Sequence, residues 1–126
     1  MAFVLDTSGS IAARELATYV ANLLGIIEET GPEQVAVIQC DTTVQRVDYL
    51  GPGETLDRIA VHGRGGTLFQ PAFDWIAGSG FAPHVIVYAT DLAARDQPTD
   101  PGVPVIWLTP TRRRTVPFGE IVEITP

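Results

Sequence analysis

The sequence contains no lysine and only one cysteine, and both shortages limit what the protein can be. All eight basic residues are arginine, 15 residues are acidic, and the formal net charge is −7. A chain of this charge lacks the basic face that binds a nucleic-acid backbone, so we expect no nucleic acid among its partners. Cys40 has no second thiol to pair with. The absence of disulfides is typical of a reducing cytosol, and we expect a cytoplasmic protein.

Long hydrophobic runs and a signal peptide are missing as well. No apolar stretch approaches the roughly 20 residues that cross a membrane, so we expect no membrane association. An arginine-only basic set is typical of codon usage in a GC-rich bacterial genome. Because a strand-like segment follows Met1 directly, we expect residues 1–126 to be one domain taken from a longer protein.

What the sequence does contain is an alternation of strand-like and helix-like segments. Hydrophobic residues make up 45% of the chain, which is enough for one continuous core. The patterns predict strands at residues 3–5, 35–39, 43–50, 84–90, 103–108 and 121–124, and helices at 11–29, at 54–60 and after Pro71. This order predicts an α/β domain with a doubly wound, mostly parallel six-stranded sheet, flanked by helices and with one antiparallel edge strand at 43–50.

Apolar spacing also predicts which helix faces are buried. In the helix at 11–29 we expect a buried face made of Leu16, Val20, Leu23, Leu24 and Ile27. In the helix after Pro71 we expect Phe73, Ile76 and Ala77 to be buried.

Asp6, Ser8 and Ser10 form a D-x-S-x-S motif where the first strand meets the first helix. Ligands of open α/β sheets bind beyond the carboxyl ends of the strands. A helix cap would explain one such side chain, whereas three polar groups in five residues favour a binding site. We expect Asp6 to be a surface carboxylate, so that its replacement by alanine leaves the domain folded.

Two further segments offer oxygen ligands. Asp91 directly follows the strand at 84–90 and would face Asp6 if the two strands are neighbours, although alone it could be a turn residue. Thr67 follows two glycines that allow a close approach, although such a loop could also be merely flexible. A cation between two carboxylates removes their repulsion. Hydroxyls and carboxylates without nearby histidine or cysteine suit Mg²⁺ or Mn²⁺ better than zinc.

The segments FVLDTSGSI, GRGGTLFQP and VYATD together resemble the metal-ion-dependent adhesion site of von Willebrand A domains. The resemblance covers nearly the whole chain. It is closest to the A-like domain at the C-terminus of uncharacterised bacterial proteins whose N-terminal half resembles a metallopeptidase. The resemblance implies a metal site made of Asp6, Ser8, Ser10, Thr67 and Asp91. Relatives often have Asp at the position of Leu68 and Gly at that of Leu92, and neither position is expected to hold a ligand.

By this resemblance, the chain is expected to be a protein-interaction domain and not an enzyme, although a missing N-terminal domain could be a metallopeptidase. A partner protein would supply a Glu or Asp to the metal, and related bacterial proteins often work beside AAA-type ATPases. One alternative is a degenerate scaffold that binds no metal. Another is a phosphotransferase or hydrolase with Asp6 as nucleophile, which would want a second acid where Ser8 stands. An aspartic protease is disfavoured because Ser8-Gly9 reverses the order in its D-T-G-S signature.

Several other residues have two interpretations. Asp41 ends the second strand and is either a hairpin turn residue or a group beside the site. Cys40 is expected to be a buried small hydrophobic residue, and Trp75 and Trp107 are expected in the core. The run at 112–114, three arginines, is either a solvated loop or a surface for an acidic partner.

Overall fold

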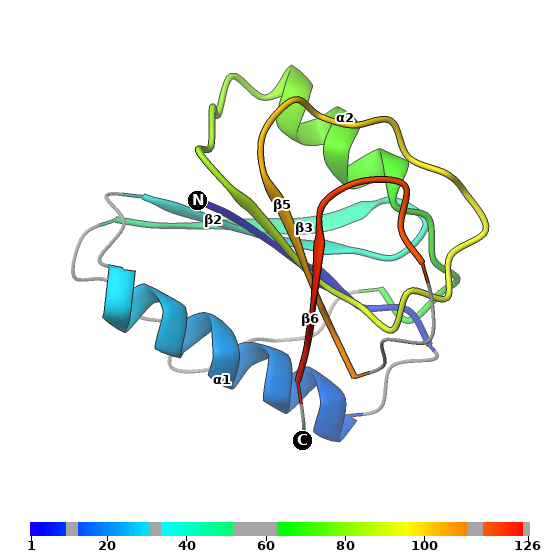
Figure 1. Ribbon diagram of the computed structural model, residues 1–126, viewed down its shortest axis with the longest axis horizontal. Helices are drawn as coiled ribbons and strands as arrows, with labels where there is room; N and C mark the ends of the chain where they lie inside the picture. Colours follow the sequence, from blue (N-terminus) through cyan, green and yellow to red (C-terminus); the bar gives the residue numbers. More distant parts are fainter. Residues whose placement is uncertain (10–12, 31–33, 52–62, 111–114, 125–126) are drawn as a thin grey trace.

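The computed structural model describes residues 1–9, 13–30, 34–51, 63–110 and 115–124. Its strands are β1 (Ala2–Asp6), β2 (Val35–Cys40), β3 (Val44–Leu50), β4 (Ile86–Ala89), β5 (Val105–Thr109) and β6 (Glu120–Glu123), and its helices are α1 (Ala13–Thr30) and α2 (Gln70–Gly78). The strands form one sheet in the order β3-β2-β1-β4-β5-β6, and α1 and α2 cover opposite faces (Figure 1). Only the β2–β3 pair is antiparallel among these strands. The predicted mostly parallel sheet with an antiparallel edge strand is confirmed.

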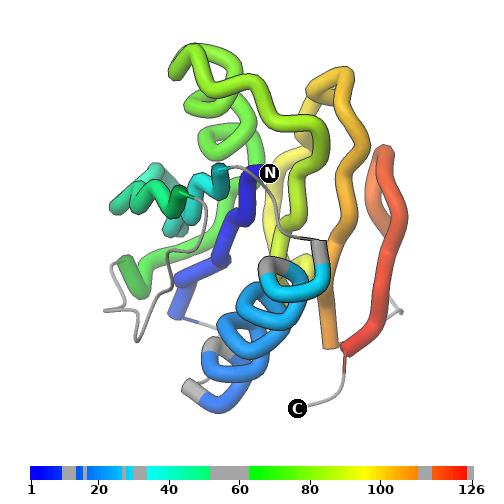
Figure 2. The backbone as a smooth tube through the Cα atoms, turned by 90° about the vertical axis from the view of Figure 1, so that its left-hand side faces the viewer, coloured from blue at the N-terminus to red at the C-terminus, as the bar shows by residue number. Residues whose placement is uncertain are grey.

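The central strand β1 brings distant parts of the chain together. It lies between β2 and β4, with Leu5 opposite both Gln39 and Ala89. Figure 2 shows this order by colour, from the teal hairpin through blue β1 to red β6. Every residue of β1, β2 and β4 is buried, which is why these strands are apolar except for Asp6 and Gln39. Since these three strands run parallel, the segments that follow them meet at one edge of the sheet, the edge formed by the carboxyl ends of the strands.

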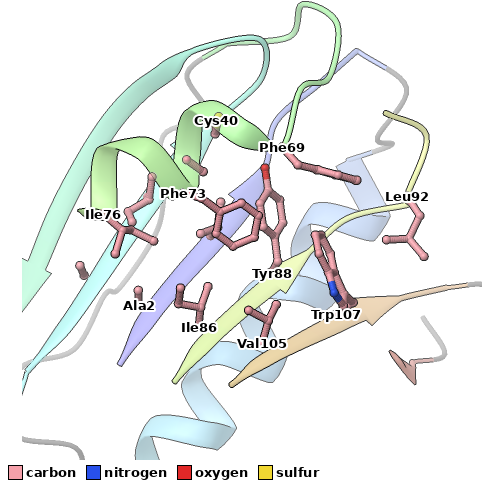
Figure 3. Close-up of a cluster of buried hydrophobic side chains, with 14 residues drawn as sticks. Ala2, Cys40, Phe69, Phe73, Ile76, Ile86, Tyr88, Leu92, Val105 and Trp107 are labelled. Atoms are coloured by element: carbon pink, nitrogen blue, oxygen red, sulfur yellow. The ribbon is translucent and has the colours of Figure 1, made fainter. Parts of the chain in front are cut away.

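The sheet separates two hydrophobic cores. The core under α2 contains the packed rings of Phe69, Phe73, Tyr88 and Trp107, which are grouped beneath the helix in Figure 3. Of the two tryptophans predicted in the core, Trp107 is fully buried and its indole N–H donates to the Phe118 carbonyl at 2.9 Å, whereas Trp75 is half-buried and packs against the cluster from outside. Large buried aromatic rings contribute much of a core's packing energy. The core on the other face lies between the sheet and α1.

The predicted helix faces needed correction. In α1 the buried stripe is centred on Tyr19 and Leu23, with Ile26 packed beside them, whereas Leu24 is 36% exposed. Leu24 lies about 100° around the helix from Leu23, and that step carries it out to solvent. In α2 the buried residues are Ala72, Phe73 and Ile76, and Ala77 is exposed. The side chains of Leu16 and Ile27 are outside the described residues.

Strand boundaries also moved by one or two residues. The strand predicted at 103–108 begins at Val105, because Pro104 lacks the N–H that a strand ladder needs. The strand predicted from His84 begins at Ile86, whose N–H donates to the Pro104 carbonyl at 2.9 Å. The helix predicted at 54–60 and the arginine run at 112–114 lie outside the described residues. Neither α1 nor α2 has the length and apolarity needed to cross a bilayer.

Candidate metal centre

The Asp6 carboxylate lies at the end of β1 and has no exposed surface. Its Oδ1 accepts the Ser8 backbone N–H at 2.8 Å, and its Oδ2 accepts the Thr90 hydroxyl at 2.6 Å. The expectation of a surface carboxylate was wrong, because Thr7 and Ser8 are themselves buried against the loop that begins at Gly63. Asp6 is therefore a buried residue whose hydrogen bonds belong to the folded structure.

The environment of Asp6 disfavours its ionised form. Burial raises the pKa of the Asp6 carboxyl, and the negative charge of Asp91 raises it further, while hydrogen bonds from Thr90 and Ser8 oppose the rise. A divalent cation beside both carboxylates would reverse this balance and favour their ionised forms. The electrostatics of the site thus fit a cation.

The loop that carries Thr67 packs on the segment after β1. The Arg64 N–H donates to the Thr7 carbonyl and the Gly9 N–H donates to the Gly65 carbonyl, both at 2.7 Å. A Cβ on Gly9 would lie 2.9 Å from the Arg64 carbonyl oxygen, so this contact requires glycine. The half-buried Thr67 is consequently carried by a loop that is fixed beside Ser8.

Asp91 reaches the same edge of the sheet from β4. It is half-buried, and its Oδ1 accepts the Ala93 N–H at 3.0 Å. Thr90, which we had not predicted as a site residue, links the two strands, since its hydroxyl donates to Asp6 and accepts the Leu92 N–H at 3.1 Å. The only signal for Thr90 in the sequence is its position directly before Asp91.

The loops of the site contain strained backbone. Among the described residues, the non-glycine residues with positive φ are Arg64, at 79°, and Leu92, at 63°. A left-handed conformation costs an ordinary residue roughly 1–2 kcal/mol, and such strain concentrates at functional sites. Glycine is the residue that would adopt the Leu92 conformation most easily.

Asp41 combines both of its predicted interpretations. It is 5% exposed, and its Oδ1 accepts the Thr43 N–H at 3.2 Å and the Gln45 side-chain amide at 3.0 Å, which closes the hairpin turn. Its Oδ2 accepts the Gly65 N–H at 3.0 Å and so reaches the glycine-rich loop. Burial disfavours the charge of Asp41, but these hydrogen bonds outweigh it and lower the pKa of the carboxyl.

Cys40 is buried as predicted and is not placed for thiol chemistry. Burial raises the pKa of its thiol to about 12, so almost none of it is ionised at neutral pH. Its Sγ contacts the Asp41 carbonyl at 3.7 Å, which is the weak donor contact of a buried thiol.

Four of the five predicted metal residues can be assessed. The carboxylates of Asp6 and Asp91 interact electrostatically, Ser8 is bonded to Asp6, and the Thr67 loop is docked beside Ser8. Ser10 lies outside the described residues. Within the described ranges, no group of three or more His, Cys, Asp or Glu side chains could hold a metal ion, so a cation here would need hydroxyl ligands. The donor set of hydroxyls and carboxylates fits Mg²⁺ or Mn²⁺.

Comparison with known proteins gives one family. The family described as VWA-like domain (DUF2201) matches residues 1–125, which is nearly the whole chain. No curated protein matches the chain.

Proposed function

The chain belongs to this VWA-like domain family, and from that premise we propose that it is a protein-interaction domain that binds a divalent metal. The metal would be Mg²⁺ or Mn²⁺, held by Asp6, Ser8, Ser10, Thr67 and Asp91. The metal would in turn bind a Glu or Asp side chain of a partner protein. By resemblance, AAA-type ATPase systems are the first class of partner to examine.

The observation that carries the proposal is the buried carboxylate of Asp6 beside a second carboxylate. Its neighbours that donate hydrogen bonds are the neutral groups of Ser8 and Thr90, and Asp91 adds negative charge. Burying a carboxylate is costly unless a charge or a metal compensates it. A dication beside Asp6 and Asp91 would supply that compensation, which favours a metal site over a degenerate scaffold.

A metal at this site would remain electrophilic. Hydroxyl ligands are neutral, so a dication held partly by Ser8 and Thr67 keeps much of its charge. The nearby Asp41 carboxylate is occupied by three hydrogen bonds, and position 68 carries Leu. Octahedral Mg²⁺ usually retains exchangeable water, which an external carboxylate can replace.

The geometry favours binding over phosphoryl transfer by Asp6. An aspartyl phosphotransferase would want a second acid close to its nucleophile, and the residue whose N–H donates to the Asp6 carboxylate is the neutral Ser8. We therefore propose no enzymatic activity for this chain.

Metal binding should raise the melting temperature. Mg²⁺ at about 100 times its Kd stabilises the folded state by roughly 2.7 kcal/mol, which corresponds to a rise of about 10 °C for a domain of this size. Differential scanning calorimetry with 5 to 10 mM Mg²⁺, with EDTA and with matched K⁺ would measure it. An equal melting temperature in all three conditions would favour the scaffold interpretation.

A further inference from the structure

Helix α2, which follows Thr67, is capped by a residue from another loop. Its N-cap residue is Phe69, which provides no side-chain hydrogen bond. Asp96 supplies the missing acceptor, since its carboxylate accepts the Phe69 N–H at 2.9 and 3.0 Å and the Gln70 N–H at 2.7 Å. A carboxylate also complements the positive end of the helix dipole. The loop after Asp91 is thereby joined to the end of the Thr67 loop.

Two more contacts hold the same junction. The Gln70 side-chain oxygen accepts the Thr99 N–H at 2.7 Å, which gives the loop after Asp91 a second attachment to α2. The ring of Phe69 is 5% exposed and packs against Tyr88 and Trp107, at centroid distances of 5.1 and 4.9 Å. Figure 3 shows Phe69 beside these two rings at the end of α2. The junction is anchored in the core as well as through Asp96.

The other side of the Thr67 loop is held by Asp41. The Asp41 carboxylate accepts the Gly65 N–H at 3.0 Å, and the Asp41 carbonyl accepts the Leu68 N–H, also at 3.0 Å. A Cβ on Gly65 would lie 2.9 Å from Asp41 Oδ2, so the loop approaches this carboxylate as closely as glycine allows. Thr67 lies between these anchored positions.

We infer that Asp41 and Asp96 are positioning residues, which fix the Thr67 hydroxyl for the metal without contacting the metal. The inference rests on the proposed function and deepens it. The Asp41 carboxylate accepts the Gly65 N–H before Thr67, and the Asp96 carboxylate accepts the Phe69 and Gln70 N–H groups after it, so the two carboxylates fix the backbone on both sides of Thr67. Because Asp96 belongs to the loop that begins at Asp91, it also links two predicted ligands that are 24 residues apart in the sequence.

The first test uses the metal-free protein and the NMR backbone order parameter of Thr67. We expect a lower order parameter in Asp41→Ala and in Asp96→Ala. The Thr67 order parameter of Asp96→Asn should lie between those of wild type and Asp96→Ala, because the one carbonyl oxygen of asparagine can still accept an N–H. The matched controls are Asp48→Ala, which loses an exposed pairing with Arg46, and Asp100→Ala, which loses a bond to Gly102 within its own loop. Neither control variant should change the order parameter of Thr67.

The second test measures Mg²⁺ affinity by calorimetry for the same variants. Loss of a group that orients a metal ligand commonly weakens affinity 10- to 100-fold, so we expect Kd to rise about tenfold at unchanged stoichiometry. If wild type binds Mg²⁺ while Asp41→Ala and Asp96→Ala match it in both Kd and Thr67 order, the inference is overturned. If wild type binds no Mg²⁺, the proposed function fails, and the order parameter alone decides whether these residues position Thr67.

Discussion

Asp6→Ala is expected to destabilise the metal-free domain, whereas Asp6→Asn is expected to leave it at least as stable as wild type. Alanine would leave the buried Ser8 N–H and Thr90 hydroxyl without their acceptor. An unsatisfied buried polar group costs about 1–3 kcal/mol. Asparagine keeps an oxygen for the Ser8 N–H and an amide group that can pair with Thr90. It also removes a buried negative charge near Asp91.

The difference in stability between wild type and Asp6→Asn should depend on pH, and the raised pKa of Asp6 gives its sign. Folding raises the pKa of Asp6, so proton binding favours the folded state. The stability that this group contributes is fully present below its unfolded-state pKa of about 3.9 and is lost as pH rises through its folded-state pKa. Metal-free Asp6→Asn should therefore gain stability relative to wild type as the pH increases through that range.

Urea denaturation in EDTA at several pH values would measure these free energies of unfolding. Asp74→Ala on the exposed side of α2 is a suitable control, since surface changes usually stay within about 0.5 kcal/mol. If Asp6→Ala matched wild type in stability, the hydrogen bonds of Asp6 would have no structural importance.

Binding of a partner is expected to be lost when either the metal or one of its ligands is removed. In the proposed mechanism the partner carboxylate binds the metal itself, so removal of the metal with EDTA should abolish capture. Asp91→Ala and Thr67→Ala should do the same, with a larger effect than the roughly 10- to 100-fold expected for groups outside the ligand set. Substitution of one partner acid by Gln or Asn should also weaken binding.

Affinity capture on immobilised domain, with Mg²⁺ or EDTA, would measure this loss. The control variant is Asp100→Ala, whose exposed carboxylate bonds only within its own loop among the described contacts. Replacement of the three arginines at 112–114 by alanine tests the competing docking surface. Capture that survives both EDTA and Asp91→Ala, but not the arginine replacement, would contradict the metal-bridged mechanism.

The sequence predicted the arrangement of the sheet because its central strands are continuous apolar runs. Asp6 and Asp91 were placed at one edge by a simple argument, since each follows a buried strand and parallel strands end together. The depth of Asp6 was not predictable in this way. It depends on the loop from Gly63 folding over the end of β1, a contact between segments more than 50 residues apart.

The supporting residues were harder to predict than the ligands. Asp96 lies in a polar loop where an acidic residue is unremarkable, and its role appears only when α2 is seen to begin at a residue that cannot cap it. The position of Asp41 after the second strand predicted a hairpin turn, but nothing in the local sequence predicted its contact with the distant Gly65. Tyr19 was missed in α1 because spacing alone does not fix which apolar stripe faces the sheet.

Paramagnetic broadening by Mn²⁺ tests most directly whether a divalent metal binds at this edge of the sheet. In an ¹H–¹⁵N NMR spectrum, substoichiometric Mn²⁺ should broaden the amide signals of Ser8, Thr67 and Asp91 first. Excess Mg²⁺ should restore them. The signals of Phe81 and Val85, before the opposite end of β4, should stay sharp. Sharp signals at Ser8, Thr67 and Asp91 in millimolar Mn²⁺ would contradict the proposed metal centre.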